Sequence, residues 1–509
     1  MQTLFVCVCL TICAIGFEDD ANVLVLQPLE IMTEIVHKVA RDPIGAKNEN
    51  VLKHGIKLKI SKLTTFRKSS SKVTKYKPKS STQHVFRSIP GGNGQSCPSD
   101  SSDDSTSPSV IKNYSQYEGN YEVNVIKDAI IKISALLAIG FGEAGGEMLK
   151  RNLSSTHELI PRMKGKKKSA IFMFCNIRDF DKINLALEED TMLFVNEIAD
   201  IVHSSVDRFK GAINKNIGDS FLSVWKFYNE IKSKRKRMYK KDNLLEIDPL
   251  NPQINIIADC SVLACLRIIL KINKNRNIVS YRKSKRIQRL INNFNLTMGF
   301  GLHLGYGIEG TIGSSYKIEA SYLSPNVNVA ARLETASKQF GVSILISGIL
   351  YEKLTDELKS ICRFIDCVKV KGSSLPISLY TIDLNYDVAP QKNTKVLSMG
   401  LKEKRKLYLN KKNDLHALID EYGSVSQIIL EKQSYKELIK VKHPNFTDNW
   451  ENAIDCYRKG DWMQAKESFE KCLEIDSSDG PSHTLLEYIK SYNYIHPPRW
   501  EGVRELKSK

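Results

Sequence analysis

Two polar side chains stand where apolar segments of the sequence end. Asn176 closes the run "AIFMFC", and Asp219 follows Gly218 between two strand-like segments. If these segments pair as neighbouring strands, both side chains project at one edge of the sheet. Oxygen ligands placed together suit a pair of Mg²⁺ ions, which bind the attacking and leaving oxygens of a phosphoryl displacement. A strand-end Asp is also a common turn residue, so both interpretations stay open.

The turn after Asn176 leads into a helix. Free backbone N–H groups at that helix start suit a polyphosphate, and we count Phe180 among the substrate-binding residues. Asn176 itself brings no charge, although Mg²⁺ sites depend on carboxylates; losing one anionic ligand is expected to cost about two or more powers of ten in rate. Asp179 and Asp181 lie near in sequence, but a strand-end geometry points them away from Asp219.

The surrounding pattern predicts an α+β domain, a sheet with helices on its faces. Apolar runs and period-3.6 segments alternate without a strict βαβ repeat. A basic run at 232–241 is interpreted as a solvated loop insertion. We expect strands over 170–177, 343–348, 364–372 and 377–384, a strand pair over 211–227, a Gly-rich strand hairpin over 296–313, and helices over 191–209, 257–273 and 326–340.

The N-terminal part predicts a chain held at a membrane. Residues 1–17 form a short hydrophobic segment without a basic n-region, and it falls short of the roughly 20 residues that span a bilayer. We interpret it as the remnant of a membrane span, with a buried start of the chain as the alternative. A juxtamembrane amphipathic helix is expected within 18–51, a flexible basic and Ser-rich linker over 52–118, and a dimerising helical segment over 119–163.

The C-terminal part follows the α+β domain, which we place at 164–385. A basic linker or helix is expected over 386–445. Residues 446–509 are predicted to hold a TPR-like helix pair and a tail, because small and aromatic residues recur at the repeat's offsets. One such repeat cannot bury its own face, so the pair is interpreted as a docking element or cap.

Composition narrows the function classes only in part. A net charge of +18, from 75 basic and 57 acidic residues, suits a nucleic-acid binder, a nucleotide-phosphate enzyme or a protein on an anionic membrane. The eleven cysteines are scattered and form no CxxC pair with metal spacing, which favours reduced, intracellular thiols.

Four motifs in one order resemble the class III nucleotidyl cyclases, the adenylate and guanylate cyclases. They are "FCNIRDF", "NKNIGDSFLSVW", "GFGLHLGYGIEGTIG" and "LSPNVNVAARLE", and the resemblance covers residues 168–385. The segments "LVLQPLEIM", "LLAIGFGEAG" and "PPRWEGVRELKSK" look similar to the large membrane cyclases of protists. In that branch the "PLE" segment follows the last membrane span, which supports the membrane interpretation of Leu4–Phe17. The resemblance implies a cyclase catalytic domain with a ferredoxin-like sheet.

The resemblance also assigns site residues by position. Asp219 matches the family's second metal-binding Asp, Asn176 stands where the family has its first, and the backbone carbonyl of Ile177 would face a metal. Asn328 matches the asparagine that orients the ribose. Arg332, one helical turn later, matches the arginine that neutralises the transition state, a task that suits its planar fork. Taken alone, Asn328 would be interpreted as a helix cap and Arg332 as part of a surface ion pair.

By the same resemblance, recognition of the nucleotide's base is assigned to Lys215 and Ser321. Lys215 stands where adenylate cyclases have a lysine that donates to adenine N1, and Ser321 occupies the partner position. A hydroxyl can donate or accept, so the pair favours ATP without excluding GTP. Lys371 is the candidate phosphate-binding lysine.

The resemblance implies a dimer, with Mg²⁺ or Mn²⁺, two per site in an intact centre. Each site takes its metal ligands from one chain and its base, ribose and transition-state groups from the other. We expect a membrane-associated adenylate cyclase with a cytoplasmic catalytic domain, which converts ATP to cyclic AMP and pyrophosphate in intracellular signal transduction. The alternative is a catalytically weakened regulatory subunit in a heterodimer with another cyclase domain. A guanylate cyclase is favoured less, and no nucleic-acid partner is expected.

Overall fold

The structure is a computed structural model that describes residues 2–21, 164–227, 253–314, 316–370, 375–386, 401–422 and 425–506, with scattered positions within 26–33 and 125–152. The chain divides into two compact units. The first holds residues 1–141 and 146–160, and the second holds residues 142–145 and 161–509.

Helix α1, Gln2–Ala21, is the continuous helix described in the first unit. Its apolar side chains are exposed, among them Phe5, Leu10 and Phe17. In the described parts of the chain, no helix combines the length and the apolar character needed to cross a membrane. The linker predicted at 52–118 lies outside the described residues, as does most of the predicted helix within 18–51.

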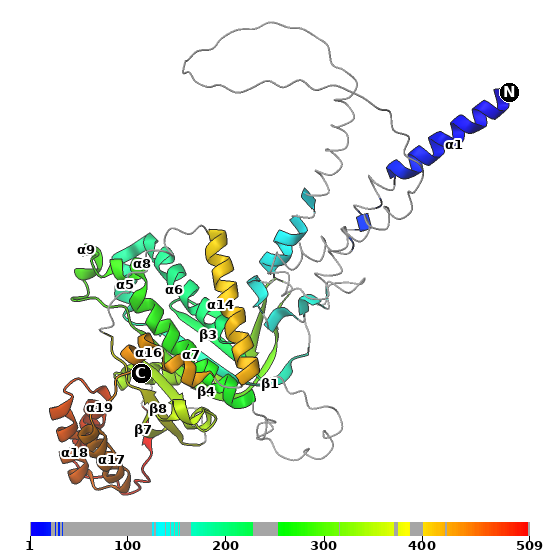
Figure 1. Ribbon diagram of the computed structural model, residues 1–509. Coiled ribbons are helices and arrows are strands. Elements are labelled where there is room, and N and C mark those ends of the chain that lie inside the picture. Colours follow the sequence, from blue (N-terminus) through cyan, green and yellow to red (C-terminus); the bar gives the residue numbers. More distant parts are fainter. Residues whose placement is uncertain are drawn as a thin grey trace, which may run out of the picture. The chain divides into compact units, whose positions relative to one another are not determined.

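A nine-stranded sheet organises the described part of the second unit (Figure 1). The strand order is β2-β3-β1-β4-β6-β8-β7-β9, and β5 pairs with β4 off this path. Neighbours are antiparallel except for β4 with β6 and β7 with β9. The strands are β1 Lys166–Ile177, β2 Ala212–Ile217, β3 Ser220–Lys226, β4 Met298–Gly313, β5 Ile318–Leu323, β6 Ile344–Ser347, β7 Cys362–Lys369, β8 Ile377–Ile382 and β9 Arg504–Glu505.

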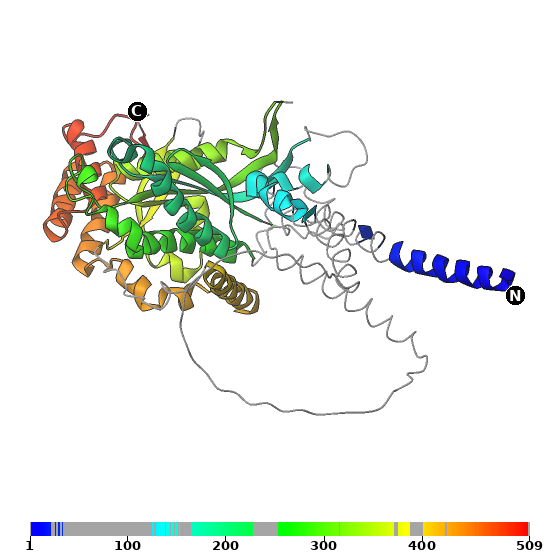
Figure 2. The ribbon, with the colours of Figure 1, turned by 90° about the horizontal axis from the view of Figure 1, so that it is seen from above.

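Helices cover both faces of this sheet (Figures 1 and 2). One face of β1, with Ile171 and Met173, packs in a core with α6 and α7. The other face, with Phe172, packs against Ala330 of α10. Because the part of β1 from Ala170 to Cys175 is covered on both faces, its sequence there is an unbroken apolar run. The helices of this part are α5 Phe180–Leu187, α6 Thr191–Arg208, α7 Gln253–Lys274, α8 Arg276–Tyr281, α9 Lys285–Gln288, α10 Pro325–Gln339, α11 Gly348–Tyr351 and α12 Asp356–Lys359. This α+β architecture confirms the predicted fold class.

Glycines on one face of β4 let α10 lie directly on the strand. A Cβ atom at Gly301 would stand 2.2 Å from the carbonyl oxygen of Ala330, and one at Gly305 would stand 2.3 Å from the side chain of Asn326. The prediction of a hairpin within 296–313 is therefore wrong. These residues form the single strand β4, because its glycines serve helix packing, and the turn to β5 comes only after Gly313.

The segment expected as a basic linker or helix contains α14 Leu401–Tyr422, α15 Ser426–Leu430 and α16 Gln433–Leu438. Tyr408 and Lys412 of α14 donate hydrogen bonds to Asp207 Oδ2 of α6, at 2.8 and 2.7 Å. Leu415 and Ile419 are buried in the same core as α6 and α7. This segment is thus packed onto the sheet's helical layer.

The C-terminal segment, predicted as a helix pair, contains three helices and a strand. These are α17 Pro444–Lys459, α18 Trp462–Ile475, α19 Gly480–Ser491 and β9, and both views show the helices together at one end of the unit (Figures 1 and 2). Trp450, Tyr457 and Phe469 share a hydrophobic core with Leu333 of α10 and Leu379 of β8. These helices therefore belong to the same compact unit as the sheet.

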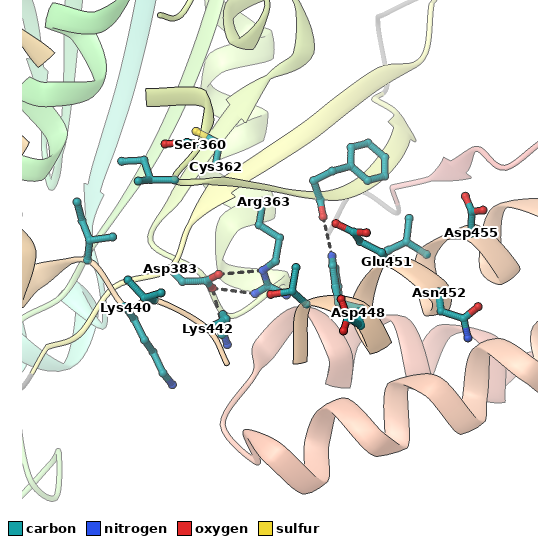
Figure 3. Close-up of a pocket in the computed structure, with 17 residues that line it drawn as sticks. Ser360, Cys362, Arg363, Asp383, Lys440, Lys442, Asp448, Glu451, Asn452 and Asp455 are labelled. Carbon is teal, nitrogen blue, oxygen red and sulfur yellow. Dashed lines mark hydrogen bonds and ion pairs between the residues drawn. The ribbon is translucent and has the colours of Figure 1, made fainter. Parts of the chain in front are cut away.

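Charged side chains join this helical group to β7. Arg363 of β7 lies 2.8 Å from Asp383 (Figure 3) and 2.7 Å from Asp479. Lys442 lies 2.7 Å from Asp476 and 2.9 Å from Asp479. The guanidinium of Arg363 also stacks on Trp450, 4.4 Å from the ring centroid. A cavity of about 820 Å³ adjoins this network, between β7 and α17.

Candidate active site

The sheet register brings Asn176 and Asp219 together. β1 and β3 pair antiparallel with Asn176 opposite Ser220, so the end of β1 reaches the turn that carries Asp219. Asn176 Nδ2 donates to Asp219 Oδ2 at 2.7 Å and to Ser220 Oγ at 2.8 Å. Ser220 Oγ donates to Asp219 Oδ1 at 3.1 Å. Both carboxylate oxygens of Asp219 therefore accept hydrogen bonds from neighbouring side chains.

This arrangement does not fit two divalent cations. Because a carboxylate only accepts hydrogen bonds, Asn176 turns its NH₂ group toward Asp219, where a cation would bridge two carboxylates. A Mg²⁺ site needs hard, preferably anionic oxygen ligands, and this edge offers one carboxylate with the carbonyl of Ile177. Among the described residues, no group of three or more His, Cys, Asp or Glu side chains is placed to hold a metal.

Two backbone N–H groups where β1 ends already donate hydrogen bonds to backbone carbonyl groups of neighbouring segments. The N–H of Ile177 donates to Asp219 O at 3.1 Å, and that of Arg178 donates to Thr297 O at 3.0 Å. Helix α5 then begins at Phe180, which is half-buried, with Asp179 in a left-handed conformation at φ 54° before it. Only N–H groups beyond Arg178 are left to meet a phosphate group.

Arg178 ties the end of β1 to α10, a contact that the sequence motifs do not reveal. Its Nη1 lies 3.3 Å from Glu334 Oε1, and its Nη2 donates to Ser337 Oγ. Burial raises the pKa of Glu334, the Arg178 charge opposes that rise, and the charge of Asp219 adds to it. Gly299 lies opposite Asn176 in the register and provides the space that the Arg178 side chain occupies. A Cβ atom at this position would stand 2.3 Å from Arg178 Nη2.

Asn328 and Arg332 lie on α10 with no partner among the described residues. Asn328 is exposed and Arg332 is half-buried, and neither makes a hydrogen bond or ion pair there. The helix cap is Ser324, whose side chain accepts from the N–H of Asn326. The plainer interpretation, a cap at Asn328 and an ion pair at Arg332, is therefore not what this part of the structure contains.

A β-bulge in β2 directs the side chains of Asn214 and Lys215 toward β5. The pairing with β3 slips between Ile213 and Lys215, which leaves Asn214 without an opposite residue. Bulges re-aim side chains in this way. Asn214 Nδ2 donates to Ala320 O at 3.3 Å, and Ser321 Oγ donates to Asn214 Oδ1 at 3.5 Å. The predicted base-selecting residue Ser321 is therefore buried against the bulge.

Lys215, the other predicted base-selecting residue, pairs with Glu319. Its Nζ lies 2.7 Å from Glu319 Oε2, while Lys317 Nζ lies 2.9 Å from Glu319 Oε1. Hydrogen bonds from Lys215 and then from Lys317 lower the pKa of Glu319 to about 2. The motifs do not single out Glu319; its position two residues before Ser321, on the same face of a strand, is the one signal available. Lys371 lies outside the described residues.

Comparisons with known proteins agree with the fold and the motifs. A family model described as the adenylate and guanylate cyclase catalytic domain matches residues 163–383. A second model, the RasGEF all-helical domain, matches residues 1–154, most of which lie outside the described residues.

Curated relatives are named adenylate cyclases. One from Anabaena cylindrica is 24% identical over 280 residues, which is 51% of this chain and 48% of the relative. Another, terminal-differentiation specific, from Dictyostelium discoideum is 24% identical over 217 residues, or 42% of this chain and 9% of the relative. The chain thus spans about half of the first relative and a small part of the second.

Solved structures with a similar fold include a bacterial light-regulated adenylyl cyclase, with a TM-score of 0.38 and 17% identity over 58% of this chain and 68% of that one. The adenylyl cyclase CyaB from P. aeruginosa has a TM-score of 0.32 and 20% identity over 45% of this chain and 99% of that one. The family model, the order of the motifs and the α+β sheet lead to one conclusion: residues 163–383 are a catalytic domain of the class III adenylate and guanylate cyclase family.

Proposed function

We propose that the chain acts as an adenylate-type nucleotidyl cyclase within a dimer, where ATP is converted to 3′,5′-cyclic AMP and pyrophosphate in intracellular signalling. The observation that carries the proposal is the pair Asn328 and Arg332, which lies on a helix packed directly on the β4 glycines and has no partners among the described residues. An arginine kept free on a fixed helix is suited to a ligand's phosphate groups.

In this proposal each residue has a separate task. Lys215 donates to the adenine ring, Asn328 orients the ribose, and Arg332 neutralises the charge that develops as the 3′-hydroxyl attacks the α-phosphate. Charge neutralisation of this kind is worth about 10² to 10³ in rate. Lys371 and the turn at Phe180 stay assigned to the phosphates as part of the proposal.

The second candidate function is a regulatory subunit, favoured by the hydrogen bond from Asn176 to Asp219. The chain then supplies the base, ribose and transition-state groups to a heterodimer, and the other chain supplies intact metal ligands. The two candidates differ only in where the metal-binding carboxylates come from.

A complementation experiment with the full chain tests both candidates. N176D/R332A restores the carboxylate pair but lacks the arginine, whereas the wild type keeps the arginine. With ATP and Mn²⁺, the regulatory candidate predicts little cyclic AMP from either protein alone and at least about tenfold more from the mixture, whereas the cyclase candidate predicts that the wild type alone is active. The control mixture, N176D/R332A with R332A, stays inactive.

The single variant N176D separates the candidates. If wild type alone turns over as fast as N176D, the regulatory candidate is rejected. If N176D alone and the mixture both stay inactive, the division of the site between two chains is rejected.

Membrane association belongs to the same proposal and rests on α1, which exposes large apolar side chains along its length. Flotation of the full chain with lipid vesicles, compared with a variant lacking residues 1–17, measures it. Equal flotation of the two would contradict a role for α1.

A further inference from the structure

Ser321 is poorly placed to reach a nucleotide base, because its side chain is buried. The residue is only 6% exposed, and its hydroxyl group lies 3.5 Å from the side-chain oxygen of Asn214. Asn214 in turn is held by the carbonyl of Ala320. The hydroxyl therefore serves the contact between β2 and β5.

Glu319 is the acidic group that faces Lys215. It lies two residues before Ser321, so both side chains leave the same face of β5. The side chain of Glu319 is 44% exposed and that of Lys215 is 29% exposed, so the pair is open to a ligand. A carboxylate has about four lone-pair positions, and the bonds from Lys215 and Lys317 use two of them.

The pair also solves a problem of electrostatics. A lysine with no carboxylate nearby is attracted to the phosphates of a bound triphosphate, because no other anion competes for its ammonium group. The carboxylate 2.7 Å from Lys215 Nζ holds that ammonium group beside β5. Two further N–H bonds of the ammonium stay available to a base.

We propose that Glu319 determines base specificity: it holds Lys215 and accepts a hydrogen bond from the 6-amino group of adenine. Lys215 then donates to adenine N1. Guanine presents an acceptor oxygen in place of the amino group and an N–H in place of the N1 acceptor, so both contacts become repulsive. This inference rests on the proposed function, since it concerns the nucleotide of the same site.

Nucleotide binding to the full chain tests the proposal. The probes are ATP, GTP and purine riboside triphosphate, which keeps N1 but has no 6-amino group, and the method is titration calorimetry with Mg²⁺. We expect E319A to weaken ATP binding at least about tenfold, the size expected for a charged hydrogen bond, and to weaken binding of the analogue less than about threefold. E319A is also expected to reduce the preference for ATP over GTP.

Two matched variants complete the test. K317A removes the other lysine on the same carboxylate, and S321A removes the hydroxyl; each is expected to change ATP affinity less than about threefold. A tenfold loss in S321A, or equal losses of ATP and analogue in E319A, overturns the proposal while leaving the cyclase function in place. If the wild type binds ATP and E319A binds it equally well, the proposal again fails alone. Absence of nucleotide binding by the wild type overturns the proposed function together with this inference.

Discussion

The amide nitrogen of Asn176 lies 2.7 Å from Asp219 Oδ2, so these two side chains are joined by a direct hydrogen bond. Two carboxylates at this distance would repel each other and would need a cation between them. The amide removes both the repulsion and the need for the cation. The strand ends are therefore stable as they stand.

The first prediction concerns metal dependence. N176D is expected to lose about 1 to 3 kcal/mol of stability in EDTA, because a hydrogen bond is replaced by two facing carboxylates, and to regain it with Mg²⁺. Thermal denaturation with and without Mg²⁺ measures the effect. The control is S220A, which keeps the Asn176 amide, so its stability should not respond to Mg²⁺. Equal stabilisation of wild type and N176D by Mg²⁺ would contradict the prediction.

The second prediction separates chemistry from stability at Arg332. In the N176D background, R332A should lower cyclic AMP formation by about 10² to 10³. Its unfolding free energy should stay within about 0.5 kcal/mol, since Arg332 has no partner among the described residues. R178A, which breaks a half-buried contact to Glu334, is the contrasting variant that should lose stability. A comparable loss of stability in R332A would show that its role is structural.

The third prediction concerns the charged network of Arg363, Lys442 and Asp479. Asp479 is 2% exposed and pairs with Arg363 and Lys442, so D479A removes one of the carboxylates that compensate each of these two cations. We expect a loss of about 3 kcal/mol in unfolding free energy and faster proteolysis of the C-terminal helices. The matched control is D455A, which removes an exposed pair with Lys459 and should cost less than about 0.5 kcal/mol. Similar losses in the two variants would refute a special role for the network.

Much of the sheet follows from local pattern. The apolar run before Asn176 and the turn at Gly218 predict β1 and the β2–β3 pair, and the register then places Asn176 next to Asp219. The fold class is confirmed for this reason. The helix of Asn328 and Arg332 is equally local, since Ser324 and the following proline mark its start.

Other features depend on contacts that no local pattern encodes. Glu319 meets Lys215 because a bulge re-aims β2, and Arg178 meets Glu334 because Gly299 leaves space beneath them. The hairpin expected over 296–313 is wrong for the same reason: glycine is common in turns, but in β4 it permits close packing of α10.

The fourth prediction concerns pH. The side chain of Asp366 is fully buried and accepts from Arg504 Nε at 2.9 Å. Burial raises the pKa of Asp366 to about 6, although Arg504 and the N–H of Cys367 oppose the rise. The folded pKa thus exceeds the unfolded value of about 3.9, so this group's contribution to stability is present below pH 4 and is lost as the pH rises through 6.

Removing Arg504 raises that folded pKa further. R504A should therefore be destabilised more at pH 8, where an unpaired carboxylate is buried, than at pH 5, where the carboxyl is protonated. Urea unfolding at the two pH values measures this difference. The double variant R504A/D366N should no longer show this difference between the two pH values. A destabilisation by R504A that is the same at pH 5 and pH 8 would contradict the prediction.

The pairing of β9 with β7 also bears on how the chain is made. Val368 and Lys369 of β7 meet Arg504 and Glu505, which are synthesised only after all of the C-terminal helices. Until then β7 has an open edge, and an open edge invites pairing with other chains. During translation, the sheet is complete only when its latest strand has left the ribosome.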